Sequence, residues 1–182
     1  MKIGIIIGSI RDGRNGKAVG DWVAQQAAKV AESQFQVLDL REFGLPLLTS
    51  ATPPAAADRQ YGSEPVTRWS QAVDDCDGFI FVTPEYNHGV PGAFKNAVDS
   101  LGPEWIGKTV AFVSYGADGG VRATEQWRQI VANFQMLDAR AQVALSLFQD
   151  FDKDGFAPQD RRAGELATLF GQLITLTATL TR

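Results

Sequence analysis

Short apolar runs alternate with amphipathic segments along this 182-residue chain. The first run, KIGIIIG at residues 2–8, lacks polar alternation, which is typical of a strand buried on both faces of a parallel sheet. Apolar residues at helical spacing lie between later runs, and the stripe from Leu166 to Leu180 predicts a closing helix. The later runs predict four more strands, at 35–40, 78–82, 108–114 and, more weakly, 141–146.

This alternation predicts an α/β fold, a doubly wound five-stranded parallel sheet of order 2-1-3-4-5 with helices on both faces. A chain of 182 residues with 45% hydrophobic content suits a single domain over residues 1–182. In such sheets a ligand binds outside the carboxyl ends of the strands, near the point where the strand order reverses. We expect three loops to meet there: 8–17, 83–92 and 114–122.

Two other segments have predictable features. Residues 41–62 contain proline and glycine without a sustained period, which predicts a long loop. Ser63 is expected to cap the helix that follows. Cys76 lies on the apolar stripe of that helix and has acidic neighbours, so this single cysteine is expected in the core rather than as a reactive thiol.

The charge balance disfavours two classes of partner. Seventeen Lys and Arg residues against 21 Asp and Glu residues give a net charge of −4, so no nucleic acid and no anionic membrane surface are expected as partners. The apolar N-terminal stretch ends at Arg11, too early for a signal peptide, and the run at 166–180 is shorter than a bilayer span. We therefore expect a cytoplasmic protein without a membrane segment.

The first loop, GSIRDGRNGK at 8–17, has the features of an anion site. It joins a buried strand to a helix start, where unpaired N–H groups and the helix dipole favour negative charge. Ser9 adds a hydroxyl donor, and Gly16 lets the backbone approach a phosphate-sized group. A plain glycine turn with solvated arginines is the alternative, but it does not explain the clustered cations Arg11, Arg14 and Lys17 in an acidic protein.

This loop lacks the features of two common phosphate sites. A Walker A loop needs Lys and then Ser or Thr where this chain has Arg14 and Asn15. The glycines at 8, 13 and 16 do not form the Gly-x-Gly-x-x-Gly fingerprint of dinucleotide sites. A terminal phosphate monoester, as on a mononucleotide, fits better.

The second loop begins with PEYN, directly after the third strand. Pro84 ends that strand, while Tyr86 supplies an aromatic face and Asn87 an amide, which together suit a planar heterocycle. The half from Pro91 onward is explained by a helix start. No fold requirement is expected to select the residues at 85–88.

The third loop, within SYGADGGVRA, has three glycines in five residues, which permits close backbone approach to a flat ring. Because it lies at the same expected sheet edge, it completes a cleft with a phosphate end and a ring end. That shape matches flavin mononucleotide (FMN).

The motifs GSIRDGR, PEYNHGVPGAFKNAVD and SYGADGGVRA, in this order, resemble the NADPH-dependent FMN reductase family, which has a flavodoxin-like fold and includes quinone, azo-dye and chromate reductases. Many members have Ser or Thr where Arg14 stands and Asn where Gly16 stands, so Arg14 is expected to neutralise the phosphate by charge instead. The resemblance implies that the first loop holds the phosphate and the other two border the isoalloxazine ring. The implied cofactor-binding residues are Ser9, Arg11, Arg14, Asn15, Gly16, Pro84, Glu85, Tyr86, Asn87, Ser114, Tyr115, Gly116, Gly119 and Gly120.

The resemblance also implies an FMN-dependent NAD(P)H oxidoreductase. Hydride would pass from NADPH or NADH to FMN, and electrons then to a small-molecule acceptor such as a quinone, azo compound, metal oxyanion or free flavin, by ping-pong kinetics. Backbone N–H groups would stabilise charge on the ring, so no catalytic side chain is expected. Lys17 or Arg122 would favour a 2′-phosphate. A homodimer or homotetramer is implied, with contacts from exposed Tyr61 and Trp105 and from the last helix.

Two features resemble sites of other functions but lack residues that those sites need. His88 is the sole histidine and has neither a second histidine or cysteine for a metal site nor a Gly-x-Ser-x-Gly elbow, so a positional role is expected. The run DFDKDG at 150–155 imitates an EF-hand, but Arg161 stands where a bidentate glutamate is required, so no metal is expected and the run is interpreted as an acidic turn. A non-enzymatic flavodoxin-like electron carrier and a flavin-free binding module remain as alternatives.

Overall fold

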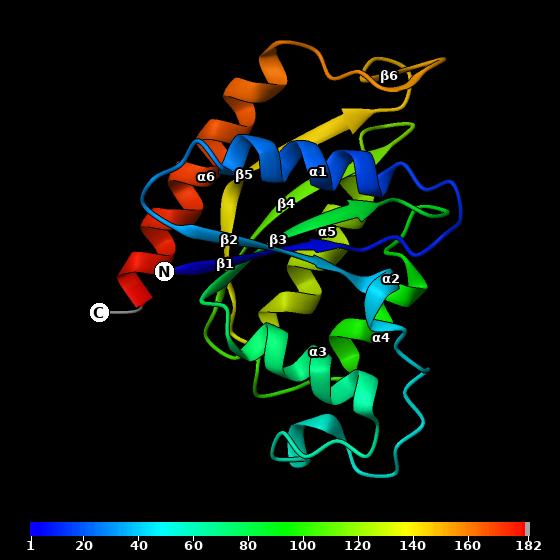
Figure 1. Ribbon diagram of the computed structural model, residues 1–182, viewed down its shortest axis with the longest axis vertical. Coiled ribbons are helices and arrows are strands. Elements are labelled where there is room, and N and C mark those ends of the chain that lie inside the picture. The colour runs from blue at the N-terminus through cyan, green and yellow to red at the C-terminus, as the bar shows by residue number, and fades with distance from the viewer. Residues whose placement is uncertain (181–182) are drawn as a thin grey trace.

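A computed structural model describes residues 1–180 of the protein. Five parallel strands form its central sheet, in the order β2-β1-β3-β4-β5 (Figure 1). The predicted fold class and strand order are therefore confirmed. The strands are β1 (Lys2–Ile7), β2 (Gln34–Asp39), β3 (Gly78–Pro84), β4 (Thr109–Gly116) and β5 (Leu137–Ser146).

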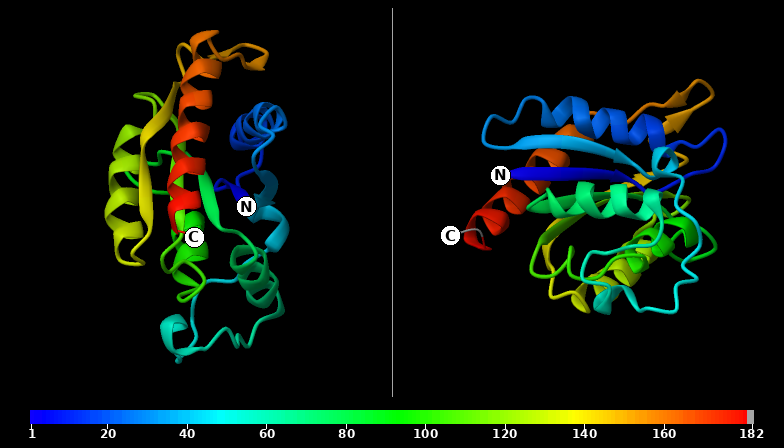
Figure 2. Two further views of the ribbon diagram at one scale, coloured as in Figure 1. Left: turned by 90° about the vertical axis from the view of Figure 1, so that its left-hand side faces the viewer. Right: turned by 60° about the horizontal axis from the view of Figure 1, so that its bottom comes forward.

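Helices cover both faces of the sheet, as Figure 2 shows. On one face, α1 (Gly16–Ala27) and α6 (Arg161–Leu180) pack against the strands. The opposite face carries three helices: α3 (Glu64–Asp74), α4 (Gly92–Asp99) and α5 (Val121–Ala132). Each face has its own hydrophobic core, and β3 and β4 are buried along their whole length.

The two cores arise because successive strand side chains point to opposite faces. Ile5 of β1 packs in the core beneath α1 and α6, whereas its neighbour Ile6 packs in the core beneath the other three helices. The second core is aromatic: the ring of Phe81 lies 5.3 Å from Trp127 and 6.1 Å from Trp105, both in edge-on arrangements. Strands buried on both faces have no polar side, which is why these runs lack polar alternation.

The long segment at 41–62 is less irregular than expected. It begins within a short helix, α2 (Leu40–Phe43), and contains a 3-10 turn, η1 (Pro54–Ala56). Ser63 does precede α3, but its side chain makes no capping hydrogen bond within residues 1–180. Strand β5 begins at Leu137, four residues before the predicted run at 141. The pattern of the sequence does not indicate this first half as a strand, because it is partly exposed and contains polar residues.

Two aromatic residues expected to be exposed are instead part of the core or its edge. Trp105 is fully buried, and its indole N–H donates to the carbonyl of Val98 at 3.0 Å, so the prediction that it is an exposed subunit contact is wrong. Tyr61 is half-buried, and its hydroxyl donates to the buried carboxylate of Glu104 at 2.8 Å. A loop position alone does not make an aromatic side chain exposed.

Two further sequence features now have a structural explanation. Cys76 is buried, as predicted, and burial raises the pKa of its thiol to about 11. The acidic run contributes to the hairpin of β6 (Phe151–Asp152) and β7 (Gly155–Phe156), and the first residue of the run, Asp150, is buried against Arg162. Within residues 1–180, no helix is long and apolar enough to cross a membrane.

Candidate functional site

Loops from three neighbouring strands meet at the carboxyl edge of the sheet, on the right of Figure 1. Ser9 follows β1, Tyr86 follows β3, and Tyr115 lies near the end of β4. The Ser9 hydroxyl lies 2.7 Å from the Tyr86 hydroxyl, and Pro84 is paired in register with Tyr115. Residues 77 positions apart in the chain are thus brought into direct contact.

The start of α1 lies against Tyr115. A Cβ placed on Gly16 would lie 2.6 Å from the Tyr115 hydroxyl oxygen, so a larger residue here would force Tyr115 or the helix start to shift. Burial, and then the nearby Tyr86, raise the pKa of the Tyr115 phenol, although a hydrogen bond with Ser9 opposes this. Tyr115 therefore stays protonated at neutral pH. Asn15 precedes the helix without a side-chain cap among the described residues, so the first N–H groups of α1 have no side-chain acceptor.

The two arginines of the first loop have different surroundings. Arg11 is exposed, and its guanidinium lies 5.7 Å from the centroid of the Tyr86 ring. Arg14 is largely buried and makes two hydrogen bonds of 2.6 Å to the two carboxylate oxygens of Asp39. It also donates to the Ser9 carbonyl oxygen at 2.5 Å. The hydrogen bonds with Asp39 raise the pKa of Arg14.

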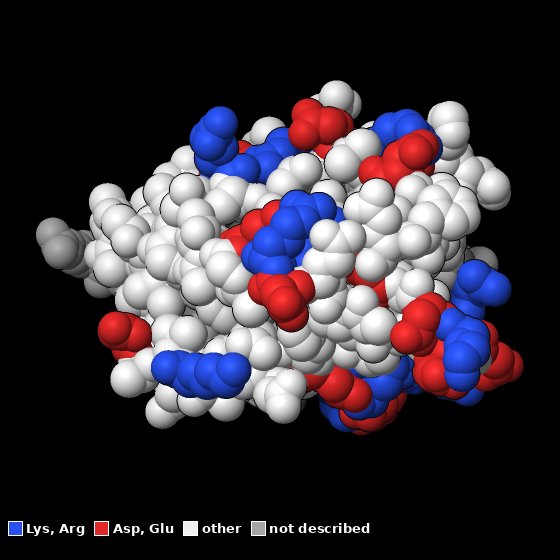
Figure 3. All heavy atoms as spheres, turned by 90° about the horizontal axis from the view of Figure 1, so that it is seen from above, with Lys and Arg blue, Asp and Glu red and all other residues white. Residues whose placement is uncertain are grey.

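These contacts give Arg14 a partner that the sequence does not indicate. Its charge is matched by Asp39, so it does not offer an uncompensated cation to a phosphate. Lys17, the third cation of the loop, pairs with Asp21 at 2.5 Å on the surface of α1. On the face shown in Figure 3, basic and acidic side chains lie next to one another in the same way. Arg11 is thus the cation of this loop that is left for a bound anion among the described residues.

The second loop turns back on itself within four residues. Tyr86 and Gly89 exchange two backbone hydrogen bonds of 3.0 Å, and the residues between them, Asn87 and His88, have φ values of 50° and 65°. A two-residue turn with positive φ at both central positions is a type I′ turn, in which asparagine is favoured. Asn87 is therefore selected in part by the turn. Gln126 of α5 fixes the turn by donating to the His88 carbonyl at 2.9 Å.

Glu85 also has a structural role. Its carboxylate accepts hydrogen bonds from the backbone N–H of Arg122 at 3.0 Å and from the Arg122 side chain at 2.7 Å. The N–H of Ala123 approaches the same carboxylate at 3.4 Å, so Glu85 caps the start of α5. The expectation that no fold requirement selects residues 85–88 is wrong for both Glu85 and Asn87. Arg122 also pairs with Asp118, which does not favour its predicted contact with a 2′-phosphate.

The third loop is shaped by its glycines. Gly119 and Gly120 have φ values of 74° and 73°, a conformation that glycine adopts without strain. The Ser114 hydroxyl donates to the Gly119 carbonyl at 2.6 Å, so it holds the loop rather than facing outward. A Cβ on Gly116 would lie 3.1 Å from the backbone nitrogen of Gly120, which shows how tightly the loop folds over the end of β4.

The donor set at this edge suits a phosphate. Ser9 and Tyr86 supply hydroxyl groups, Arg11 supplies a guanidinium, and the uncapped start of α1 supplies backbone N–H groups. The one carboxylate within the first loop, Asp12, is paired with Arg41. The glycine-rich third loop lies at the same edge of the sheet, next to the second loop, so the residues present are compatible with FMN.

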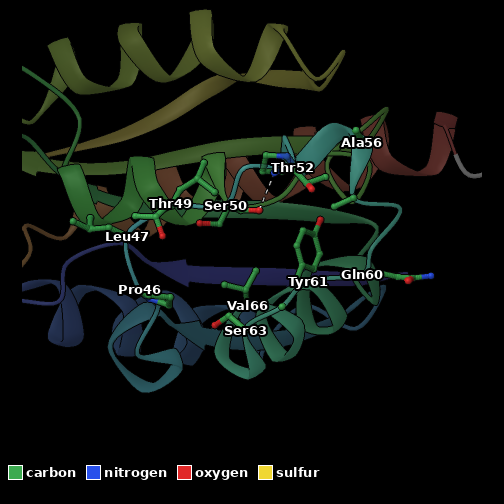
Figure 4. A pocket seen from close by; sticks show the side chains of 15 residues that line it. Pro46, Leu47, Thr49, Ser50, Thr52, Ala56, Gln60, Tyr61, Ser63 and Val66 are labelled. Atoms are coloured by element: carbon green, nitrogen blue, oxygen red, sulfur yellow. Dashed lines mark hydrogen bonds between the residues drawn. The ribbon is translucent and has the colours of Figure 1, made fainter.

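A cavity away from this edge does not suit the same ligand. A cavity of about 630 Å³ is lined by residues of the segment 46–63, but not by its charged residues Asp58 and Arg59, and by Val66 and Ser100 (Figure 4). Its described lining contains hydroxyl and aliphatic side chains and no charged side chain, so it does not suit a phosphate. A smaller cavity of about 200 Å³ adjoins the first loop at Ile10 and extends to α4.

Several residues that support the site could not be recognised from the sequence. Asp39 and Gln126 bind the first and second loops from other elements. An acidic residue between a strand and a helix is recognisable as a helix cap, and the Asp39 carboxylate does accept a hydrogen bond from the N–H of Arg41 in α2, at 3.1 Å. Its partnership with Arg14 has no local sequence signal, and neither does the contact of Gln126.

Known proteins similar to this chain agree with the geometry. The NADPH-dependent FMN reductase family model matches residues 1–150. The chain is 43% identical over 129 residues to an NAD(P)H-dependent FMN reductase of Nectria sp, covering 69% of this chain and 64% of that protein. It is 31% identical over 179 residues to an NAD(P)H-dependent FMN reductase of Schizosaccharomyces pombe, covering 96% and 90%.

Solved structures share the fold. FerB, a flavoenzyme NAD(P)H:(acceptor) oxidoreductase from Paracoccus denitrificans, has a TM-score of 0.73 and 21% sequence identity, and the match covers 98% of this chain and 97% of that one. The flavodoxin-like architecture therefore extends over nearly the whole chain. The family model matches residues 1–150, and the S. pombe relative aligns with 96% of this chain, so the chain belongs to the NADPH-dependent FMN reductase family.

Proposed function

We propose that the protein is an FMN-dependent NAD(P)H oxidoreductase in which residues 1–182 act as a single FMN-binding domain. The observation that carries this proposal is the meeting of Ser9, Arg11 and Tyr86 with the uncapped start of α1 at the carboxyl edge of the sheet. Family membership supports the same cofactor. The geometry suits a ligand that is anionic at one end and planar at the other.

The first loop holds the phosphate. Arg11 supplies the positive charge, and the N–H groups at Asn15 and Gly16 supply donors aligned with the helix dipole. Ser9 is 1% exposed and its hydroxyl lies 2.7 Å from that of Tyr86, so these two hydroxyl groups act together as donors to the phosphate. Gly16 keeps this corner narrow because Tyr115 packs directly against it.

The second and third loops border the isoalloxazine ring. Tyr86 and Asn87 lie on one side, where the type I′ turn fixes the backbone, and Pro84 and Glu85 form the base of that turn. On the other side are Ser114, Tyr115, Gly116, Gly119 and Gly120. The Glu85 contacts with Arg122 and Ala123 join the two sides, so both edges of the ring site are held in one geometry.

When bound, FMN supplies the two-electron redox chemistry that amino-acid side chains lack. The chain contributes position and electrostatics: backbone N–H groups of the two ring loops stabilise negative charge at the ring edge. No side chain at this edge is required as a nucleophile or base. The nicotinamide and the acceptor would occupy the site between the second and third loops in turn, which would give ping-pong kinetics.

The names of relatives indicate the class of acceptor. The chain is 34% identical over 165 residues to a quinone reductase of Pseudomonas putida and 28% identical over 141 residues to an NADH-dependent flavin reductase subunit of Lactobacillus johnsonii. We propose a small-molecule acceptor such as a quinone, azo compound, metal oxyanion or free flavin. We further propose NADPH, with NADH as the alternative, a homodimer or homotetramer, and a cytoplasmic location.

Steady-state kinetics of the FMN-loaded protein test this function. With NADPH varied at several quinone concentrations, parallel double-reciprocal lines are expected. Intersecting lines would contradict the ping-pong sequence while leaving oxidoreductase activity in place. A protein that binds FMN but reacts with neither nicotinamide would favour the electron carrier, and a protein that binds no FMN would refute the proposal.

A further inference from the structure

A buried ion pair fixes the first loop from the neighbouring strand. The Arg14 side chain is 10% exposed and that of Asp39 is 3% exposed. Asp39 ends β2, which is the strand beside β1 in the sheet, and both of its carboxylate oxygens accept from Arg14 at 2.6 Å. This fork-to-fork geometry fixes the guanidinium in orientation as well as in position.

The same guanidinium sets the direction of one peptide group. Arg14 donates to the Ser9 carbonyl oxygen at 2.5 Å. In a planar trans peptide the carbonyl and the following N–H point in opposite directions, and the described residues contain no cis peptide bond. By holding the Ser9 carbonyl, Arg14 therefore directs the Ile10 N–H away from itself. The loop is thus fixed with this donor turned to the side opposite the ion pair.

We propose that Arg14 and Asp39 are positioning residues that hold the first loop in its phosphate-binding conformation, and that Arg14 does not itself contact the phosphate. This proposal rests on the proposed FMN function. Its consequence is a preference for FMN over riboflavin, because the arranged donors act on the phosphate group alone. The ring loops are fixed separately, by Glu85 and Gln126.

A second ion pair on the same loop supplies a matched control. Arg41 pairs with Asp12 at 2.6 Å, and this pair joins the first loop to α2, the short helix that follows β2. Its side chains are 49% and 93% exposed, so solvent screens the pair and the carboxylate is free to move. This exposed pair should not fix the loop.

The test compares FMN and riboflavin dissociation constants of the apoprotein, measured by quenching of flavin fluorescence. Asp39→Asn and Arg14→Lys should each raise the FMN constant about tenfold or more, since each removes charge-assisted hydrogen bonds. The riboflavin constant should stay within about twofold, because riboflavin has no phosphate. Asp12→Asn should leave both constants unchanged. Arg14→Lys retains the charge, so it separates the geometry of the fork from electrostatics.

The outcomes separate this inference from the proposed function. Tighter FMN binding by Asp39→Asn would mean that the released Arg14 contacts the phosphate, which overturns the positioning role. Equal weakening of FMN and riboflavin binding would mean a general loss of the site and would also overturn the positioning role. Unchanged FMN binding by Arg14→Lys would overturn it as well. A wild-type protein that binds no FMN would instead refute the proposed function. Circular dichroism spectra test whether each variant is folded. If Asp39→Asn is not folded, the dissociation constants of Arg14→Lys decide whether the ion pair has the positioning role.

Discussion

Replacing the buried Asp150 by asparagine tests whether a buried ion pair stabilises the fold next to the ring site. The Asp150 carboxylate is fully buried and accepts four hydrogen bonds. Two come from the Arg162 guanidinium, at 2.9 and 3.0 Å, and the others from the backbone N–H groups of Ser146 and Gln159, at 2.9 and 3.2 Å. Because Ser146 ends β5 and donates to the Ala117 carbonyl, Asp150 supports the third loop indirectly.

The expected loss follows from what Asp150→Asn leaves behind. Asparagine has one acceptor oxygen, and its NH2 group faces donors, so Arg162 remains buried with a reduced partner set. Breaking one partner of a buried pair costs about 3–5 kcal/mol. Arg162 also bonds Glu165 at 2.8 Å, which compensates in part, so we expect a loss of about 3 kcal/mol in the free energy of unfolding. For a chain of this size the melting temperature should fall by about 6–12 °C.

The pH dependence adds a second test. Burial alone would raise the pKa of the Asp150 carboxyl, but the hydrogen bonds from Arg162 and the backbone outweigh it and hold the pKa below 3.8. A carboxyl whose pKa is lowered by folding stabilises the protein above its unfolded-state pKa. That stabilisation is lost as the pH falls through the lower folded-state value. The difference between wild type and Asp150→Asn should therefore be complete at neutral pH and shrink below about pH 3.8.

Urea unfolding followed by circular dichroism measures both effects. Asp154→Asn is the matched control, because Asp154 belongs to the same acidic run but is exposed and pairs with Lys153 at the surface. It should leave stability unchanged. Equal losses for the two variants, or a loss for Asp150→Asn that does not change with pH, would refute the reasoning.

Two further substitutions test contacts within the site. Gly16→Ala places a methyl group 2.6 Å from the Tyr115 hydroxyl and should cost about 1–3 kcal/mol in the free energy of unfolding. Adding Tyr115→Phe removes that hydroxyl and should recover part of the loss in a double-mutant cycle. Simple additivity of the two substitutions would contradict the contact. Glu85→Gln removes the charge at the start of α5 and should cost about 1–2 kcal/mol in the free energy of unfolding. Asp118→Asn alters an exposed partner of Arg122 and should have no effect. Equal melting temperatures for these two variants would disprove the capping role.

The fold was predictable because its central strands carry an unambiguous pattern. The runs of β1, β3 and β4 are apolar on both faces, and burial on both faces is what a parallel sheet with two helical layers imposes. The start of β5 was missed because an edge strand is partly exposed and mixes polar with apolar residues. Trp105 was misplaced because its neighbours Trp69 and Phe79 lie far away in the chain.

The candidate site was predictable in location but not in the role of each residue. Loops that follow adjacent parallel strands must meet at one edge, so Ser9 and Tyr86 could be brought together from strand order alone. The role of a side chain depends on its partner. The partner of Arg14 could not be predicted, because Asp39 lies 25 residues away and gives no local signal of the ion pair. Glu85 was misjudged for the same reason, since the helix that it caps begins 36 residues later, at Val121.

Anaerobic titration of the FMN-loaded protein with NADPH tests the central claim most directly. We predict that the chain binds one FMN, that its visible absorption band is bleached by one equivalent of NADPH, and that a quinone restores the band. A protein that takes up no FMN, or whose bound FMN stays oxidised with both NADPH and NADH, would contradict the account.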